Sequence, residues 1–171
     1  SNGYQKNYDT NVFEKVLIND FKYVTTPKIS SKGFVNKLNL LFKNVTTDSK
    51  NSSEYTNTFR SQNFGSLLYD ISYPMKRKGN NYDNFLSGKA SFMYSPNKNK
   101  NIKNLDRKIN IKNVFSQNRL GLSDSVEGGQ SLTLGGEYKI TDKQNNNILT
   151  AGLASVLRDK HEEKLPINST L

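Results

Sequence analysis

The stretch Ser66-Leu-Leu-Tyr-Asp-Ile-Ser-Tyr-Pro-Met75 has a period of two. Large apolar side chains occupy every second position, and most of the residues between them are small or polar. Successive side chains on a β-strand point to opposite faces, so this stretch predicts a strand with one apolar and one polar face. The apolar positions are Leu67, Tyr69, Ile71, Tyr73 and Met75.

The same alternation recurs on both sides of this stretch. It covers residues 34–43, 86–95, 132–140 and 149–158, with a weaker candidate at Val12–Thr26. These runs reach about 10–14 residues, whereas strands of soluble proteins most often have about 5–6. A tilted strand that crosses a bilayer needs about 9–11. We therefore expect about six long strands of the membrane-spanning kind.

The connections alternate in length. Three are short (Thr26–Gly33, Lys76–Asn84 and Thr141–Asn147), and two are long and polar (Asn44–Gln62 and Ser95–Gly128). Tight turns on one side and long loops on the other are typical of up-and-down barrels. Lys108–Phe115 could form another strand, but the alternation favours placing it within the long loop. The long loops should lie outside the cell or fold into the lumen, with the short turns in the periplasm.

The composition agrees with a membrane barrel. The hydrophobic fraction is only 33%, yet the chain holds 9 Tyr and 9 Phe. Disordered chains are poor in aromatic residues, and so polar a soluble domain would lack a core. We expect an all-β fold, part of an antiparallel up-and-down transmembrane β-barrel. Residues 1–171 should be one fragment of a single outer-membrane barrel domain, cut at both ends. A soluble antiparallel sheet with one wet face remains the alternative.

Little in the sequence suggests catalysis. There is no cysteine, and His161, in a charged run, is the one histidine. Neither a Ser/His/Asp triad nor a metal site can be assembled from these residues, so we expect no catalytic residue, metal or cofactor. The net charge of +10 would attract phosphates of nucleic acid, anionic lipid or lipopolysaccharide. The basic stretch at 98–108 lacks aromatic residues spaced for base stacking, which disfavours nucleic acid.

One segment of the longer loop gathers opposite charges. Arg119, Asp124 and Glu127 lie within Asn113–Gly129, beside several glycines. An arginine and a carboxylate form strong charge-assisted hydrogen bonds. We expect Arg119 to pair with Asp124 or Glu127 and to hold this loop against the barrel wall.

The alternation also predicts which side chains face lipid. A shift of one residue in register would turn every side chain to the other face, so the assignment is explicit. The expected lipid-facing residues are Tyr69, Ile71, Tyr73, Phe92, Leu132, Leu134, Leu149 and Leu153.

Three segments resemble the LptD family, also called OstA or Imp. The first runs from Phe115-Ser-Gln-Asn-Arg-Leu120 through Asp124-Ser-Val-Glu-Gly-Gly129 into the strand Ser131–Tyr138. The others are Leu67–Met75 and Ala90-Ser-Phe-Met-Tyr-Ser-Pro96. Their order and spacing resemble that family's barrel between about residues 65 and 158. The family often has Arg directly after the loop Asp, where this chain has Ser125.

The resemblance implies a role in lipopolysaccharide assembly in the outer membrane of a Gram-negative bacterium. Proteins of this family form a very large barrel joined to a periplasmic jellyroll, through which the periplasmic Lpt bridge delivers lipopolysaccharide. An LptE-like lipoprotein plugs the lumen where it is present. This chain resembles mid-barrel strands, without the lateral gate or the jellyroll. The implied partners are lipopolysaccharide, LptE, the bridge and outer-membrane lipid. Another outer-membrane barrel (a porin or receptor) and a soluble basic β-protein that binds nucleic acid are the alternatives.

Overall fold

The computed structural model describes residues 1–7, 11–160 and 162–166. They form an 8-stranded antiparallel sheet, in the order β1-β2-β4-β5-β6-β7-β8 with β3 beside β4. The strands are β1 (Asn2–Asn7), β2 (Phe13–Val24), β3 (Lys28–Ile29), β4 (Val35–Lys50), β5 (Arg60–Lys78), β6 (Tyr82–Ser95), β7 (Gly129–Asp142) and β8 (Asn147–Arg158). The expected all-β antiparallel fold is confirmed. The sheet is open, with β1 and β8 at its two edges.

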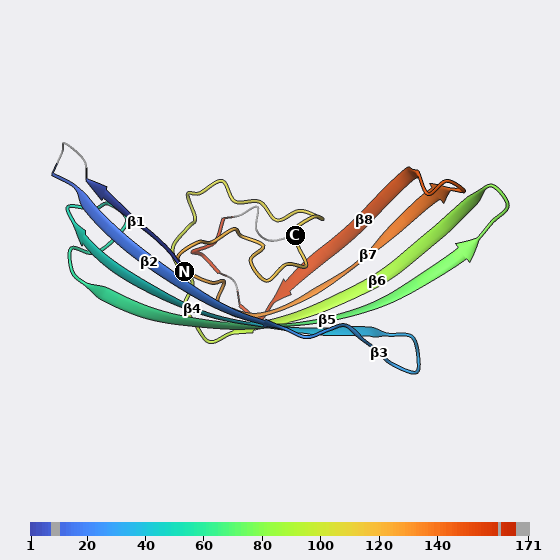
Figure 1. Cartoon of the computed structure of the whole chain (residues 1–171), viewed down its shortest axis with the longest axis horizontal. Coiled ribbons are helices and arrows are strands. Elements are labelled where there is room, and N and C mark those ends of the chain that lie inside the picture. The colour runs from blue at the N-terminus through green and yellow to red at the C-terminus, as the bar shows by residue number, and fades with distance from the viewer. Residues whose placement is uncertain (8–10, 161, 167–171) are drawn as a thin grey trace.

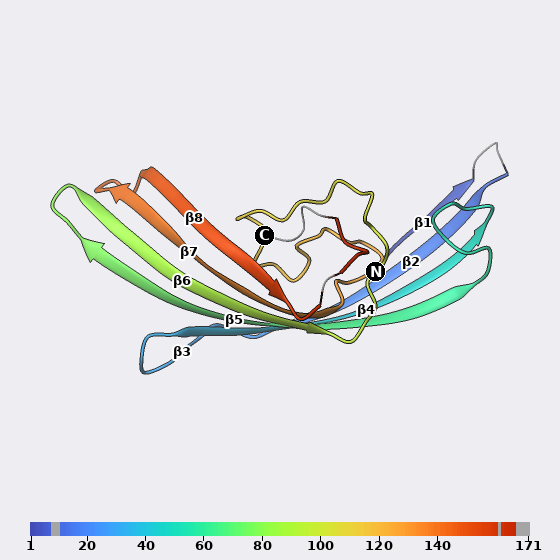
Figure 2. The same cartoon turned by 180° about the vertical axis from the view of Figure 1, so that it is seen from behind.

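The sheet is strongly curved. Figures 1 and 2 show its strands as an arc, with β1 at one end and the β5–β6 and β7–β8 turns at the other. The β6–β7 loop (residues 96–128) lies inside the arc, over its middle, together with the segment that follows β8. The sheet therefore has a concave face that carries this loop and a convex face that does not. No helix among the described residues has the length and hydropathy needed to cross a bilayer.

The β4–β5 hairpin extends past β6, its neighbour on the β5 side. Pairing of β5 with β6 starts at Leu67, opposite Tyr94, whereas β5 pairs with β4 from Arg60 onward. At the step, the Ser95 hydroxyl and the Asn97 amide both donate hydrogen bonds to the Gly65 carbonyl, each at 2.8 Å. The start of the β6–β7 loop thus covers part of the exposed edge of β5.

The expectation of a long loop over Asn44–Gln62 is wrong in extent. Strand β4 continues to Lys50 and β5 begins at Arg60, which leaves a β4–β5 loop of residues 51–59. The polar composition suggested a loop, but the period of two continues here. Val45, Thr47 and Ser49 are buried on the concave face, while the residues between them are more exposed. β-branched Val and Thr residues favour the extended backbone.

The other boundaries differ less. Lys108–Phe115 contains no strand and belongs to the β6–β7 loop, as the alternation of loop lengths predicted. The short connection after β2 contains the two-residue strand β3, and β1 is an additional strand that the hydropathy pattern did not reveal. Strand β5 spans 19 residues and is longer than expected at both ends, because it begins at Arg60 within the expected loop and Lys76–Lys78 continue it into the expected turn.

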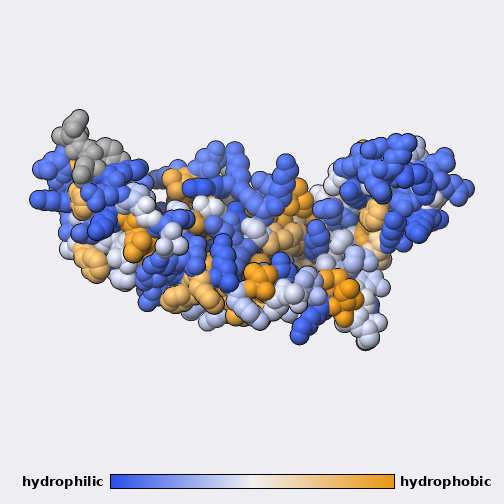
Figure 3. Space-filling view, in the orientation of Figure 1, coloured by the Kyte–Doolittle hydropathy of each residue, from blue (hydrophilic) through white to orange (hydrophobic). Residues whose placement is uncertain are grey.

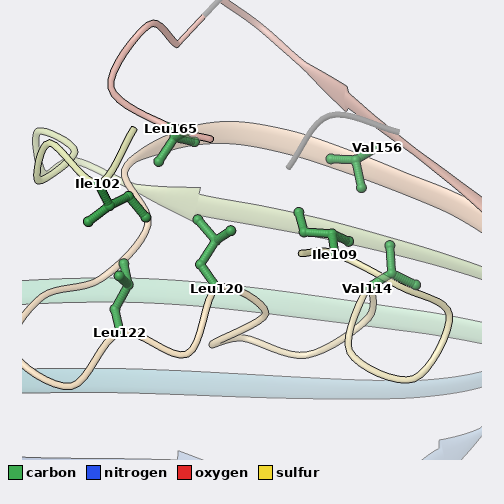
Figure 4. Packing of buried hydrophobic residues seen from close by; sticks show 7 residues of the cluster. All are labelled: Ile102, Ile109, Val114, Leu120, Leu122, Val156 and Leu165. Carbon is green, nitrogen blue, oxygen red and sulfur yellow. The ribbon is translucent and has the colours of Figure 1, made fainter. Parts of the chain in front are cut away.

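Hydrophobic packing is concentrated between the β6–β7 loop and the concave face. Most of the cluster comes from the loop itself, with Val156 from β8 and Leu165 from the segment beyond it (Figure 4). The loop members are Ile102, Ile109, Val114, Leu120 and Leu122. On the convex side, large apolar side chains are exposed instead. Figure 3 shows hydrophobic patches along the lower, convex side and hydrophilic residues at the raised ends of the arc.

Candidate functional site

The β6–β7 loop is fixed to the sheet by a buried arginine. Arg119, 3% exposed, donates hydrogen bonds from Nε and Nη2 to both carboxylate oxygens of Glu127, at 2.8 and 2.5 Å. It also donates to the hydroxyls of Ser131 at 2.8 Å and Thr133 at 3.0 Å, both on β7. The guanidinium therefore has partners on the loop and on β7. A bidentate pair fixes orientation as well as distance.

The Glu127 carboxylate pairs with two arginines. Its Oε1 accepts a hydrogen bond from Arg158 Nη1 as well as from Arg119. Glu127 is 3% exposed, and Arg158 comes from the end of β8. A buried ion pair stabilises a fold only when its geometry offsets the desolvation of the charges. Here the bidentate contact and the two hydroxyls supply that geometry, so the loop is joined to β7 through Arg119 and to β8 through Glu127. We call Arg119, Glu127 and Arg158 the buried anchor.

Asp124 is not part of the buried anchor. Its Oδ2 lies 2.5 Å from Lys100 Nζ and accepts a 3.0 Å hydrogen bond from the Tyr55 hydroxyl. Burial alone would raise the pKa of Asp124, but the hydrogen bond and charge of Lys100, helped by Tyr55, hold it below its usual value. Burial, with Tyr4 and Asp124 as neighbours, raises the pKa of Tyr55. Asp124 thus tethers the β6–β7 loop to the β4–β5 loop.

Two further contacts hold the loop to the concave face. Lys43 of β4, 5% exposed, donates a 2.6 Å hydrogen bond to the Ser123 carbonyl and pairs with Asp20 of β2 at 3.0 Å. The Gln117 side chain donates to the backbone oxygen and the hydroxyl of Ser66, at 3.0 and 2.9 Å. The loop is consequently attached to β4, β5, β7 and β8, and Lys43 also links β4 to β2.

The Asn99 side chain and a close backbone approach at Gly128 fix the end of the loop. Asn99 accepts a hydrogen bond from the Gly128 amide at 2.8 Å and donates to the Gly128 carbonyl at 3.4 Å. A Cβ atom at Gly128 would overlap the Asn97 carbonyl oxygen. The glycine is therefore required by this close approach of two stretches of backbone, just before the chain enters β7.

The residues expected to face lipid share the convex face. Tyr69 lies opposite Phe92, and Phe92 lies opposite Leu132, across β5, β6 and β7. Residues directly opposite in an antiparallel pair point to the same face. The residues that contact the loop, such as Ser66 and Thr133, occupy the alternate positions. The same registers place Ile71 with Leu134, Tyr73 with Leu153, and Leu149 beside Ile140 on the convex face.

Sequence reasoning missed several partners in these contacts. It named Arg119, Asp124 and Glu127 as one group, whereas the structure divides them between the buried anchor and the Lys100–Tyr55 tether. The distant partners Tyr55 and Arg158 carried no local signal. No group of three or more His, Asp or Glu among the described residues is placed to hold a metal ion. His161 lies outside the described residues.

Together these features define a curved antiparallel β-sheet with an apolar convex face and a loop anchored by buried charges to the concave face. A family model described as LptD, LPS transport system D, matches residues 23–168. Because the match covers most of the chain, the chain belongs to the LptD family, as the resemblance indicated. The family is one of lipopolysaccharide transport and is associated with the Gram-negative outer membrane. A search of the curated proteins finds no match.

Proposed function

We propose that this chain is a wall segment of an outer-membrane β-barrel that inserts lipopolysaccharide into the outer leaflet. The observation that carries the proposal is the anchored β6–β7 loop, which covers the middle of the concave side of a sheet whose other side is apolar. In a barrel, the convex face would meet lipid and the concave face would line the lumen. The match to the lipopolysaccharide-transport family supports this role.

The two faces have the chemistry that this arrangement needs. The convex face exposes Leu, Phe and Tyr, while the concave face carries small polar side chains such as Ser66, Ser91 and Thr133. A membrane-spanning sheet has to satisfy its backbone groups by strand pairing and has to close to remove its edges. The open edges at β1 and β8 would accordingly pair with further strands of the complete barrel.

The anchored loop has a mechanical role in this proposal. A lumen wide enough for a lipopolysaccharide molecule would leak small solutes if nothing occupied it. A loop with its own hydrophobic cluster, held by buried charges to several strands, narrows the lumen permanently on this side. The chain's contribution would be structural: it forms wall and constriction and catalyses no reaction.

The partners follow from the same role. Lipopolysaccharide would reach the barrel from a periplasmic bridge bound to a jellyroll domain elsewhere in the protein. An LptE-like lipoprotein would occupy the lumen beside the β6–β7 loop. The basic character of the chain, with a net charge of +10, suits contact with an anionic glycolipid.

Depletion of the full protein from cells tests the proposal. Newly made lipopolysaccharide should fail to reach the cell surface, while unrelated outer-membrane barrels still assemble. Surface lipopolysaccharide is measured by protection from an external modifying enzyme. Normal surface lipopolysaccharide, combined with a loss of solute uptake, would contradict the proposal and indicate a porin or receptor.

A further inference from the structure

A cavity of about 300 Å³ lies on the concave side of the projecting β4–β5 hairpin. Val45 and Thr47 of β4 with Gln62 and Phe64 of β5 contribute from the hairpin, and the β4–β5 and β6–β7 loops contribute the remaining lining. This volume is at the lower end of the range for small-molecule sites, about 300–1,000 Å³. The buried anchor contributes no residue to it.

Several polar groups at this cavity have no partner among the described residues. The side chains of Arg60, Gln62 and Lys98 line it without a hydrogen bond or ion pair to another described residue. Ser125 also lines it, is 3% exposed, and has a buried hydroxyl with no hydrogen-bond partner there. An unsatisfied buried hydroxyl is unfavourable, and a ligand hydroxyl would satisfy it. Lys100 and Asp124, by contrast, are already paired with each other.

The lining combines the features that recognise an anionic sugar. The Phe64 ring and the Tyr55 ring, over which Lys100 Nζ lies at 5.4 Å, contribute apolar surface, and Gln62, Thr47 and Ser125 offer hydrogen-bonding groups for hydroxyls. Lys98 and Arg60 are the cations left free, against the single free carboxylate of Glu54. We propose that this cavity binds a sugar bearing a phosphate or carboxylate, with the anion at Arg60 and Lys98.

This inference rests on the proposed function, since lipopolysaccharide supplies such sugars. It adds a place on this chain where the saccharide part is held, at the end of the sheet that carries the β4–β5 loop. Because that loop and the β6–β7 loop are joined through Tyr55 and Asp124, a bound sugar would contact both.

Calorimetric titration of the full-length protein in detergent tests the inference. The probe is a deacylated, phosphorylated core oligosaccharide prepared from lipopolysaccharide. Arg60→Gln and Lys98→Gln should each weaken binding about tenfold or more, because each removes a charge-assisted hydrogen bond. Ser125→Ala should weaken it less. Arg77→Gln, on the same strand at its opposite end, is the matched control and should bind as the unaltered protein does.

The competing outcomes are distinct. Equal binding of the dephosphorylated oligosaccharide would overturn the anionic part of the proposal, and equal binding of inorganic phosphate alone would overturn the sugar part. If Arg60→Gln and Lys98→Gln both bind the probe with unchanged affinity, the probe binds at another site and the proposal is wrong. If the protein fails to bind the probe yet still delivers lipopolysaccharide to the cell surface, this inference is wrong while the proposed function stands.

Discussion

Glu127 occupies the centre of the contacts that hold the β6–β7 loop. Its carboxylate accepts hydrogen bonds from two buried guanidinium groups, those of Arg119 and Arg158. Removing either arginine leaves the carboxylate with one cation. Removing the carboxylate leaves two buried cations close together without a counter-charge, which is the more unfavourable state. The loop's attachment should therefore depend more on the acid than on either base.

Glu127→Gln should lower the stability of the folded protein by about 3–5 kcal/mol, the usual cost of breaking a buried ion pair. Asp124→Asn, in the more exposed tether to Lys100, should cost less, because solvent screens that pair. Urea titration of the full-length protein in detergent, followed by its heat-modifiable migration, measures both. Equal unfolding midpoints for the two variants would contradict the assignment of Glu127 as the anchor.

The tether between the two loops should depend on pH. The pKa of Asp124 is below its usual 3.8 in the folded protein, so its ionised form contributes stability above that value. This contribution is lost as the pH falls through the lowered pKa. Hydrogen exchange of the β4–β5 loop amides, corrected for intrinsic rates, should show protection that falls progressively as the pH drops from near the usual pKa of 3.8 through the lowered pKa of Asp124. In the Lys100→Met protein, the loss of amide protection should begin at higher pH, because Asp124 no longer has its cation. The same dependence of protection on pH in both proteins would contradict the tether.

Local sequence identified the anchor only in part. Arg119 and Glu127 lie in one motif, so an arginine–carboxylate pair was predictable. The sequence could not choose between Asp124 and Glu127, because the choice depends on burial against Ser131 and Thr133 of β7. Arg158 and Tyr55 reach the loop only through the folded sheet, across 31 and 69 positions of the chain.

The strands were more predictable than their ends. A period of two identifies a half-buried strand and its two faces, and the register of β5, β6 and β7 follows that pattern. It failed at residues 44–50, where polar residues face both sides. The concave side there is covered by the β4–β5 and β6–β7 loops rather than by a continuous core. Polarity there marks a strand beneath a loop, which composition alone does not distinguish from a loop.

The orientation of β5 gives a direct test of the two faces. Ile71→Arg would place a charge on the convex face and should cost about 2–4 kcal/mol near the middle of the membrane. Ser72→Arg points to the concave face, opposite Lys89, and should be better tolerated. The amount of each variant assembled in the outer membrane is the readout. If Ile71→Arg assembles normally and Ser72→Arg does not, the lipid-facing and lumen-facing sides of the sheet have been assigned the wrong way round.

Glycine substitutions test how closely the loop is held at its junction with β7. Gly128→Ala would push a methyl group into the Asn97 carbonyl, and overpacking of this kind costs about 1–3 kcal/mol. Gly88→Ala, on β6, is the matched control, because a Cβ there meets nothing within 4 Å. We expect a lower unfolding midpoint for Gly128→Ala alone. Equal midpoints would mean that the loop end adapts freely.

The sheet as a whole is asymmetric from end to end. The β5–β6 and β7–β8 turns are tight and lie together at one end, while the projecting β4–β5 hairpin lies at the other. At the tight end, Asp83 pairs with Lys76 at 2.9 Å and with Lys143 at 2.7 Å, which joins the two turns. This asymmetry is the basis for placing the tight turns in the periplasm and the β4–β5 loop outside the cell.

The central claim is that this sheet crosses the outer membrane in that orientation. Single cysteines at Lys50, beside the β4–β5 loop, and at Asn80 and Asn146, in the tight turns, test it in whole cells. A membrane-impermeant thiol reagent should label the Lys50→Cys protein on intact cells. The Asn80→Cys and Asn146→Cys proteins should react only after the outer membrane is breached. Labelling of Asn80→Cys or Asn146→Cys on intact cells, with Lys50→Cys protected, would contradict the account.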